Sequence, residues 1–158
     1  MTHQLLRVSD PQQLARRNQI QALQDAILEE IASGREKQTF ADGATDEGND
    51  QAEHYFAEGV YGRGVLIPAG NIVIGRLHLH SRICVIAKGR CAFIDENIEG
   101  LQEVEAPWVG EFPAGSKTAV LALTDVYWIA FVGTHQTDPQ EILKTMSVFD
   151  YPALEQLK

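Results

Sequence analysis

From residue 54 onward, short apolar segments alternate with turn residues, and this pattern constrains the fold more than any other feature of the chain. Within the segments, apolar residues recur with the period of two that is typical of strands, whose side chains point to alternate faces. Many short strands separated by Gly and Pro predict an antiparallel sandwich or barrel. The predicted strands are Gly59–Ile67, Asn71–His80, Ile83–Ala87, Arg90–Ile94, Leu101–Ala106, Trp108–Phe112, Lys117–Leu123 and Val126–Val132.

The segment before the strands predicts a helix over roughly residues 11–32. Ser9 is the expected N-cap, with Gln12 as its capping-box partner, and Ser33-Gly34 ends the helix. Its apolar positions follow a period close to 3.6 and are Leu14, Ile20, Leu23, Ile27 and Ile31. We expect this stripe to pack on the outside of the β domain or on the same helix of a second subunit.

The remaining segments complete a three-part division of the chain: residues 1–53, 54–135 and 136–158. The first part ends in an acidic stretch, 34–53, which we interpret as a surface loop or a disordered linker. The last part contains a short helix that begins at Asp138-Pro139 and ends near Thr145, with a further turn expected from Pro152 onward.

Composition limits the classes of partner. The chain has 158 residues, which suits one domain, and 13 Lys and Arg against 22 Asp and Glu give a net charge of −9. This charge repels phosphate backbones, so we expect no nucleic-acid partner. The N-terminal residues do not form a secretory signal, and no apolar run has the length of a membrane span. A cytoplasmic location with reduced thiols is therefore expected.

His78 and His80 lie two residues apart inside an apolar run. On one continuous strand they would share a face, about 7 Å apart, and two imidazoles on one face can begin a metal site. Cys84 has the same parity and could complete a His/His/Cys set for zinc or iron. The alternative for Cys84 is a small buried apolar residue, which is how free cysteine usually behaves.

Lys88-Gly89, between two apolar segments, predicts a tight hairpin. That hairpin would place Cys91 diagonally across from Cys84 on one face.

These residues together resemble the cupin family. Pro68-Ala69-Gly70, Gly75, the two histidines and Gly89 resemble the first cupin motif, and residues 113–118 stand where the second would begin. The resemblance covers residues 54–135. A group of short cupin-like proteins of phages and bacteria is similar at His54-Tyr55-Phe56, Val60-Tyr61, Pro113-Ala114-Gly115 and Trp128. It implies a cupin-type jelly-roll barrel, a homodimer and a divalent transition metal such as Zn, Fe, Ni or Mn.

The chain also departs from the cupin pattern at two ligand positions. The position of the cupin Glu falls on Cys84 or Val85, and that of the second-motif His falls on Thr118. A complete cupin metal centre is therefore not supported. The alternatives are a reduced site built on His78, His80 and Cys84, or histidines that line the barrel and hold no metal.

Arg82, Thr118 and His54 are the candidate ligand-binding residues. Arg82 shares parity with the histidines, and a guanidinium inside the barrel would need a partner because an isolated buried charge is costly. That partner would be an acidic ligand or a carboxylate such as Glu103 or Glu111, which makes an anionic small molecule a candidate. Alternatively, a bulge at Ser81-Arg82 turns the side chain to solvent.

Three functions remain open from the sequence. The first is a cupin-like barrel that binds a small molecule with an incomplete metal site. The second is a cupin-type metalloenzyme, a dioxygenase or isomerase, that uses His78 and His80. The third is a non-catalytic phage structural or interaction protein with the N-terminal helix as its assembly surface.

Overall fold

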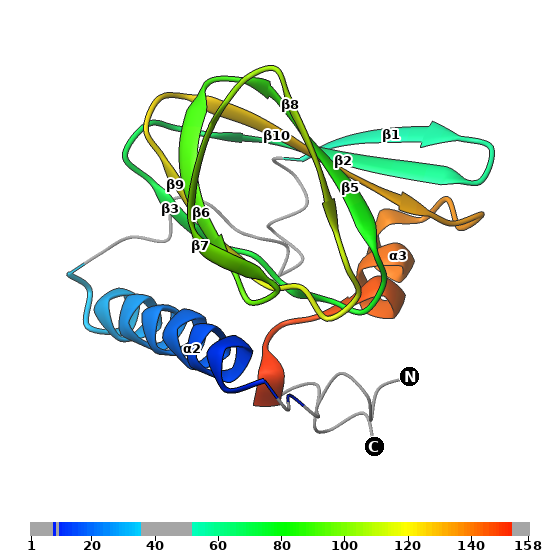
Figure 1. Ribbon diagram of the computed structural model, residues 1–158. Coiled ribbons are helices and arrows are strands. Elements are labelled where there is room, and N and C mark those ends of the chain that lie inside the picture. Colours follow the sequence, from blue (N-terminus) through cyan, green and yellow to red (C-terminus); the bar gives the residue numbers. More distant parts are fainter. Residues whose placement is uncertain (1–7, 9, 36–51, 153–158) are drawn as a thin grey trace.

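Two antiparallel sheets face each other across a hydrophobic core in the computed structural model, which describes residues 8, 10–35 and 52–152 (Figure 1). In spatial order, the five-stranded sheet contains β1 (Glu53–Ala57), β2 (Val60–Ile67), β10 (Val126–Gly133), β5 (Arg82–Lys88) and β8 (Trp108–Phe112). The four-stranded sheet contains β3 (Ile72–Ile74), β9 (Thr118–Ala122), β6 (Arg90–Asp95) and β7 (Ile98–Glu105). The predicted antiparallel barrel is therefore confirmed.

The remaining elements lie at one end of the barrel. These are a two-stranded ladder of β4 (Leu77–His78) and β11 (Ser147–Val148), and the helices α2 (Pro11–Ala32) and α3 (Pro139–Met146). Both helices match their predicted positions, and α3 begins at the predicted cap, because Asp138 Oδ1 accepts from the amide of Gln140 at 2.9 Å. None of the described helices has the length and apolar character needed to cross a bilayer.

The core lies between the two sheets and follows from the alternation of the strands. On β10, Trp128 points inward and is buried, while Tyr127 points outward and bonds to Glu53. Other inward residues from both sheets pack with Trp128, among them Val65, Ile86, Phe93, Phe112 and Val120. The aromatic rings of Phe93 and Trp128 meet edge to face at a centroid distance of 5.9 Å, a favoured arrangement.

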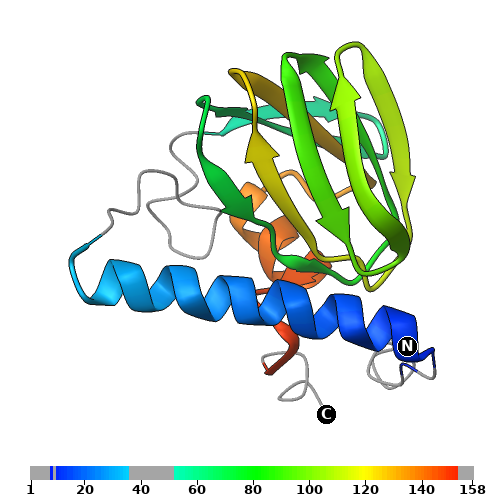
Figure 2. The ribbon, with the colours of Figure 1, turned by 60° about the vertical axis from the view of Figure 1, so that its left-hand side comes forward.

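Helix α2 crosses the end of the barrel below the four-stranded sheet (Figure 2). Its buried residues are Arg17, Ile20 and Gln24, so the face turned to the barrel is mainly polar. The predicted apolar stripe is only partly buried: Ile20 is fully buried, Leu23, Ile27 and Ile31 are half-buried, and Leu14 is exposed. The side chain of Asp10 caps the helix by accepting from the amide of Gln12, whereas Ser9, the expected cap, lies outside the described residues.

The predicted hairpin at Lys88-Gly89 is wrong. β5 pairs with β10 and β8, and β6 pairs with β7 and β9, so this turn carries the chain from one sheet to the other. Gly89 has φ +87°, and a Cβ there would lie 2.1 Å from the carbonyl oxygen of Asp125, so only glycine fits. The two cysteines consequently sit on facing sheets, both fully buried and both free thiols.

One predicted strand is interrupted. Residues 71–80 form β3 and β4, separated by Gly75 and Arg76, and the chain bends after His78. The short strands β1 and β11 were not predicted; they lie at the two ends of the described β region. The acidic stretch over 36–51 and the tail beyond Pro152 lie outside the described residues.

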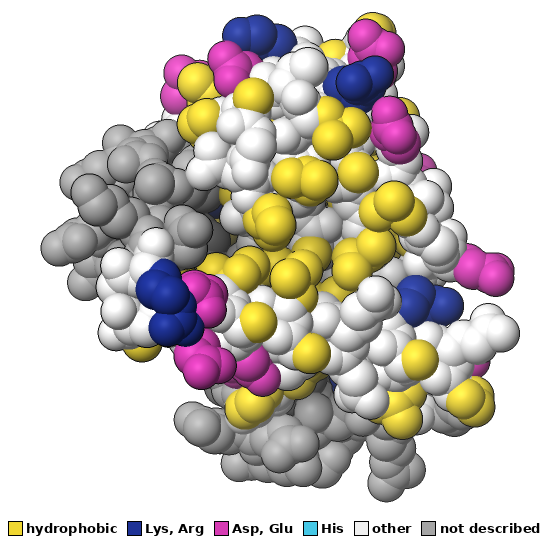
Figure 3. All heavy atoms as spheres, turned by 90° about the vertical axis from the view of Figure 1, so that its left-hand side faces the viewer, with side chains coloured by type: hydrophobic (Ala, Val, Ile, Leu, Met, Phe, Trp, Pro, Cys, Tyr) yellow, Lys and Arg dark blue, Asp and Glu magenta, His cyan; other side chains and the backbone are white. Residues whose placement is uncertain are grey.

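The outer side of the four-stranded sheet carries a band of apolar side chains above α2 (Figure 3). Its exposed members include Ile72 on β3, Leu121 on β9 and Leu101 on β7. The five-stranded sheet also has exposed apolar residues on its outer side, including Leu66, Ile83 and Val109. Both outer faces are therefore more apolar than the net charge of the chain suggests.

Candidate functional site

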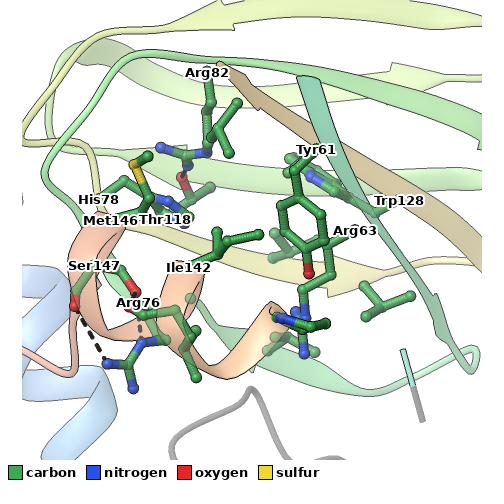
Figure 4. A pocket seen from close by; sticks show the side chains of 18 of the residues that line it. Tyr61, Arg63, Arg76, His78, Arg82, Thr118, Trp128, Ile142, Met146 and Ser147 are labelled. Carbon is green, nitrogen blue, oxygen red and sulfur yellow. Dashed lines mark hydrogen bonds between the residues drawn. The ribbon is translucent and has the colours of Figure 1, made fainter. Parts of the chain in front are cut away.

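A cavity of about 140 Å³ lies inside the barrel beside α3 (Figure 4). Inward residues of β2, β3, β9 and β10 form its walls, and Ile142 and Met146 of α3 border it from one end. The lining is mainly apolar, but Arg63, Arg76 and Arg82 also reach it. The described residues that line the cavity include no Asp or Glu, so its charge is positive.

Arg82 is the most informative of these cations. It begins β5, points into the barrel and is only 6% exposed, so of the two alternatives left open by the sequence the structure shows the inward one. Its guanidinium carbon lies 4.7 Å from the centroid of the Phe112 ring. Nη2 donates to Thr118 Oγ1 at 3.2 Å, whereas the buried Nη1 has no hydrogen-bond partner within the described part of the chain. An unsatisfied buried donor costs about 1–3 kcal/mol, which a ligand acceptor would offset.

The carboxylates proposed as partners of Arg82 do not approach it. Glu103 lies near Arg90 at 3.9 Å, and Glu111 is exposed on the outer side of β8. Instead, Thr118 Oγ1 accepts from Arg82 and donates to Asp95 Oδ2 at 2.7 Å. Asp95 is fully buried and also accepts from Ser116 Oγ and from the amide of Asn97. One hydroxyl group therefore bridges the guanidinium of Arg82 and the buried carboxylate of Asp95.

His78 lines the same cavity from β4 and is partly buried. Burial is the largest cause that holds the pKa of His78 well below its ordinary value of 6.5. Nearby positive charges lower this pKa further, in the order Arg82, Arg76, Arg63 and Lys117. The imidazole is therefore neutral at pH 7, with one nitrogen able to donate and one able to accept.

His54 reaches the cavity only through a neighbour. Its Nδ1 lies 2.8 Å from the hydroxyl of Tyr61, a buried residue of β2 that lines the cavity. Burial is the main cause that raises the pKa of Tyr61, so its hydroxyl keeps its proton at neutral pH. His54 therefore does not line the cavity itself, but its contact with the hydroxyl can orient Tyr61, which does.

The three predicted metal ligands are not brought together. His78 lines the cavity, His80 is exposed beyond the end of β4, and Cys84 lies in the core outside the cavity lining. The expected shared face of the histidines is wrong because the strand ends at His78. Burial raises the pKa of Cys84, which disfavours the thiolate that binds metals.

A cupin-type metal centre does not fit this arrangement. Among the described residues, no group of three or more His, Cys, Asp or Glu side chains is placed to hold a metal ion. The positive charges around His78 also disfavour the binding of a metal cation there. Metal binding by His78, His80 and Cys84 stays a prediction that this geometry does not favour.

Arg63 and Arg76 of the cavity were not singled out from the sequence. Arg63 shares inward parity on β2 with Val65 and Ile67, so its orientation could have been predicted from the alternation. Arg76 donates from Nε to Ser147 Oγ at 2.8 Å and joins the end of α3 to β4. No local pattern indicates that α3 returns to this end of the barrel, since that contact depends on the tertiary fold.

No family model matches the sequence, and no curated protein matches it. Solved structures with a similar fold include a cupin-2 domain containing protein from Shewanella frigidimarina, with 8% identity over 52% of this chain and 79% of that chain and a TM-score of 0.43. An RmlC-like cupin family protein with a double-stranded β-helix fold from Methanocaldococcus jannaschii has 15% identity over 53% of this chain and 79% of that chain, with a TM-score of 0.45.

Salicylate 1,2-dioxygenase from Pseudoaminobacter salicylatoxidans is also similar, with 15% identity and a TM-score of 0.45. The match covers 51% of this chain but only 24% of the dioxygenase. At these identities and TM-scores, the likeness assigns neither a family nor an activity to the chain. The antiparallel barrel rests on the observed strand order.

Proposed function

We propose that this cupin-like barrel binds a small anionic molecule in its interior cavity, with the guanidinium of Arg82 holding the negative charge. The observation that carries the proposal is the buried Nη1 of Arg82, which lacks a hydrogen-bond partner within the described residues. The cavity lining is otherwise mainly apolar and includes no described acidic residue. An anion would satisfy the donor and compensate a buried charge, and charge-assisted hydrogen bonds are the stronger class.

The alternative of a metalloenzyme that uses His78 and His80 is less well supported. It requires both imidazoles and a third ligand in one place, whereas His80 is exposed and Cys84 belongs to the core. A phage structural or interaction role has no specific observation in its favour. We therefore place the function of the chain in the cavity rather than on α2.

The proposal predicts that an anion stabilises the protein through Arg82. In a thermal-denaturation screen of carboxylates, inorganic phosphate and sulfonates, at least one anion should raise the Tm of the wild type. At about 100 times its Kd, a ligand adds about 2.7 kcal/mol, which corresponds to a rise of about 5–10 °C for a chain of this size. The variant Arg82→Gln should lose this rise.

Arg90→Gln is the matched control, because Arg90 is exposed and lies outside the cavity; it should respond as the wild type does. An unchanged Tm with every anion would contradict the proposal. Stoichiometric zinc, iron, nickel or manganese in the purified protein, lost when His78 and His80 are both replaced by alanine, would support the metalloenzyme instead.

A further inference from the structure

The cavity narrows the class of anion, and this inference rests on the proposed function. We propose that the ligand is a small monocarboxylate with an apolar body of about six carbon atoms, the size that a cavity of this volume accepts. Its carboxylate lies against Arg82, beside His78 and Thr118. Its body lies among the apolar residues of β2, β9, β10 and α3.

The size of the body follows from the volume of the cavity. The cavity measures about 140 Å³. An engineered apolar cavity of about 150 Å³ in another protein binds benzene. One six-membered ring, or a branched aliphatic chain of similar size, therefore fills the space, whereas a fused ring system or a long acyl chain exceeds it.

The apolar character of the body follows from the walls. The cavity is lined by Val65, Val120, Trp128, Ala130, Ile142 and Met146 among others. A polar body such as a sugar would place hydroxyl groups against these side chains without partners, and each unpaired hydroxyl costs free energy. A hydrocarbon body instead gains from leaving water, at roughly 25 cal/mol for each Å² that is buried.

A carboxylate fits the polar end better than a phosphate does. Nη1 of Arg82 offers two N–H donors and the neutral imidazole of His78 one more, and the two oxygens of a carboxylate have enough lone pairs to accept all three. Thr118 already bridges Arg82 to the fully buried carboxylate of Asp95. The negative charge behind Thr118 repels a dianion more strongly than a monoanion. The part of the lining around Arg82 is therefore suited to one negative charge, whereas Arg63 and Arg76 reach other parts of the lining (Figure 4).

Isothermal titration of the full chain with four probes tests the inference. Benzoate has the required body and charge, benzamide has the body without the charge, acetate has the charge without the body, and inorganic phosphate is a different anion. Benzoate should bind at least about tenfold more tightly than each of the others, as expected when a charged hydrogen bond or a buried ring is lost. The Arg82→Gln substitution should weaken the binding of benzoate about 10- to 100-fold.

A second variant tests the apolar body without altering the charge. Ala130 lines the cavity on β10. The larger side chain of Ala130→Leu should fill part of the cavity and weaken the binding of benzoate at least about tenfold, because overfilling a packed space is costly. Ile129→Leu, on the outer side of the same strand, should leave benzoate binding unchanged. Together with the four probes on the wild type, these two variants test the inference even if Arg82→Gln does not fold.

The outcomes separate this inference from the proposed function. Preferential binding of phosphate that depends on Arg82 would overturn the monocarboxylate while leaving an anion site in place. Equal binding of benzoate and benzamide would overturn both. Benzoate binding that Ala130→Leu leaves unchanged would place the ligand outside the cavity and overturn the inference.

Discussion

Ionisable side chains inside the barrel make the stability of the protein depend on pH. Arg82 and Asp95 are both buried and communicate through the hydroxyl of Thr118, while His78 faces the same cavity without a charge of its own at neutral pH. The protein thus keeps one uncharged imidazole close to several fixed positive charges. Protonating that imidazole opposes the folded state.

We predict that His78 lowers stability in mild acid. Its pKa is lowered in the folded state and ordinary, near 6.5, in the unfolded state, so the unfolded state takes up the extra proton as the pH falls below about 7. When the pH falls from 7.5 to 5.5, the free energy of unfolding of the wild type should decrease by about 1 kcal/mol more than that of His78→Asn. Urea denaturation at the two pH values measures the difference.

The control for this prediction is His80→Asn, because His80 is exposed and lies outside the cavity. Its loss of stability between the two pH values should equal that of the wild type. Identical pH dependence in the wild type and His78→Asn would show that protonating His78 does not oppose folding.

At the scale of elements, α2 is attached to the barrel by polar contacts. Arg17 Nε donates to Glu96 Oε2 at 2.8 Å, and the hydroxyl of Tyr151 donates to the same oxygen at 2.8 Å. Glu96 is fully buried, and the guanidinium carbon of Arg17 lies 4.5 Å from the centroid of the Tyr151 ring. One carboxylate therefore joins the helix, the turn after β6 and the end of the described chain.

We predict that Arg17→Met is strongly destabilising. The substitution keeps an unbranched side chain but leaves the carboxylate of Glu96 buried with its charge uncompensated, which costs about 3–5 kcal/mol. Arg35→Met, which breaks the exposed pair with Glu30, should have little effect on stability, because water screens exposed ion pairs. Urea denaturation of both variants measures the contrast. Equal effects would show that the polar attachment of α2 adds little to stability.

At the scale of the whole molecule, the homodimer implied by the cupin resemblance stays a prediction. The outer side of the five-stranded sheet includes exposed apolar residues, with Ile83 47% and Val109 65% accessible. These two are diagonal neighbours on β5 and β8. Apolar residues grouped on one face of a sheet are common at sites of association, so this face is where we expect the second copy.

Replacing both residues by lysine tests that expectation. In a dimer joined through this face, the Ile83→Lys/Val109→Lys variant would bring like charges together, and its sedimentation mass should fall from that of two chains to that of one. Leu101→Lys on the four-stranded sheet is the control and should remain dimeric. A monomeric wild type would contradict the homodimer, and a dimeric double variant would exclude this face.

Features that depend on local geometry could be predicted from the amino-acid sequence. The alternation of side chains identified most strands, and it included the inward orientation of Arg82 as one of two alternatives. It also located both helices, because capping residues and proline act over a few neighbouring positions. Covalent geometry decides these properties wherever the segment is placed.

How the segments combine depends on contacts that form in the folded chain. The turn at Lys88-Gly89 joins two sheets instead of two paired strands, so Cys84 and Cys91 lie on facing walls. β4 ends where its pairing with β11 ends, and this removes His80 from the face of His78. α3 borders the cavity although it follows the last strand of the barrel. Each of these outcomes depends on contacts between residues far apart in the chain, whose free energies no local pattern records.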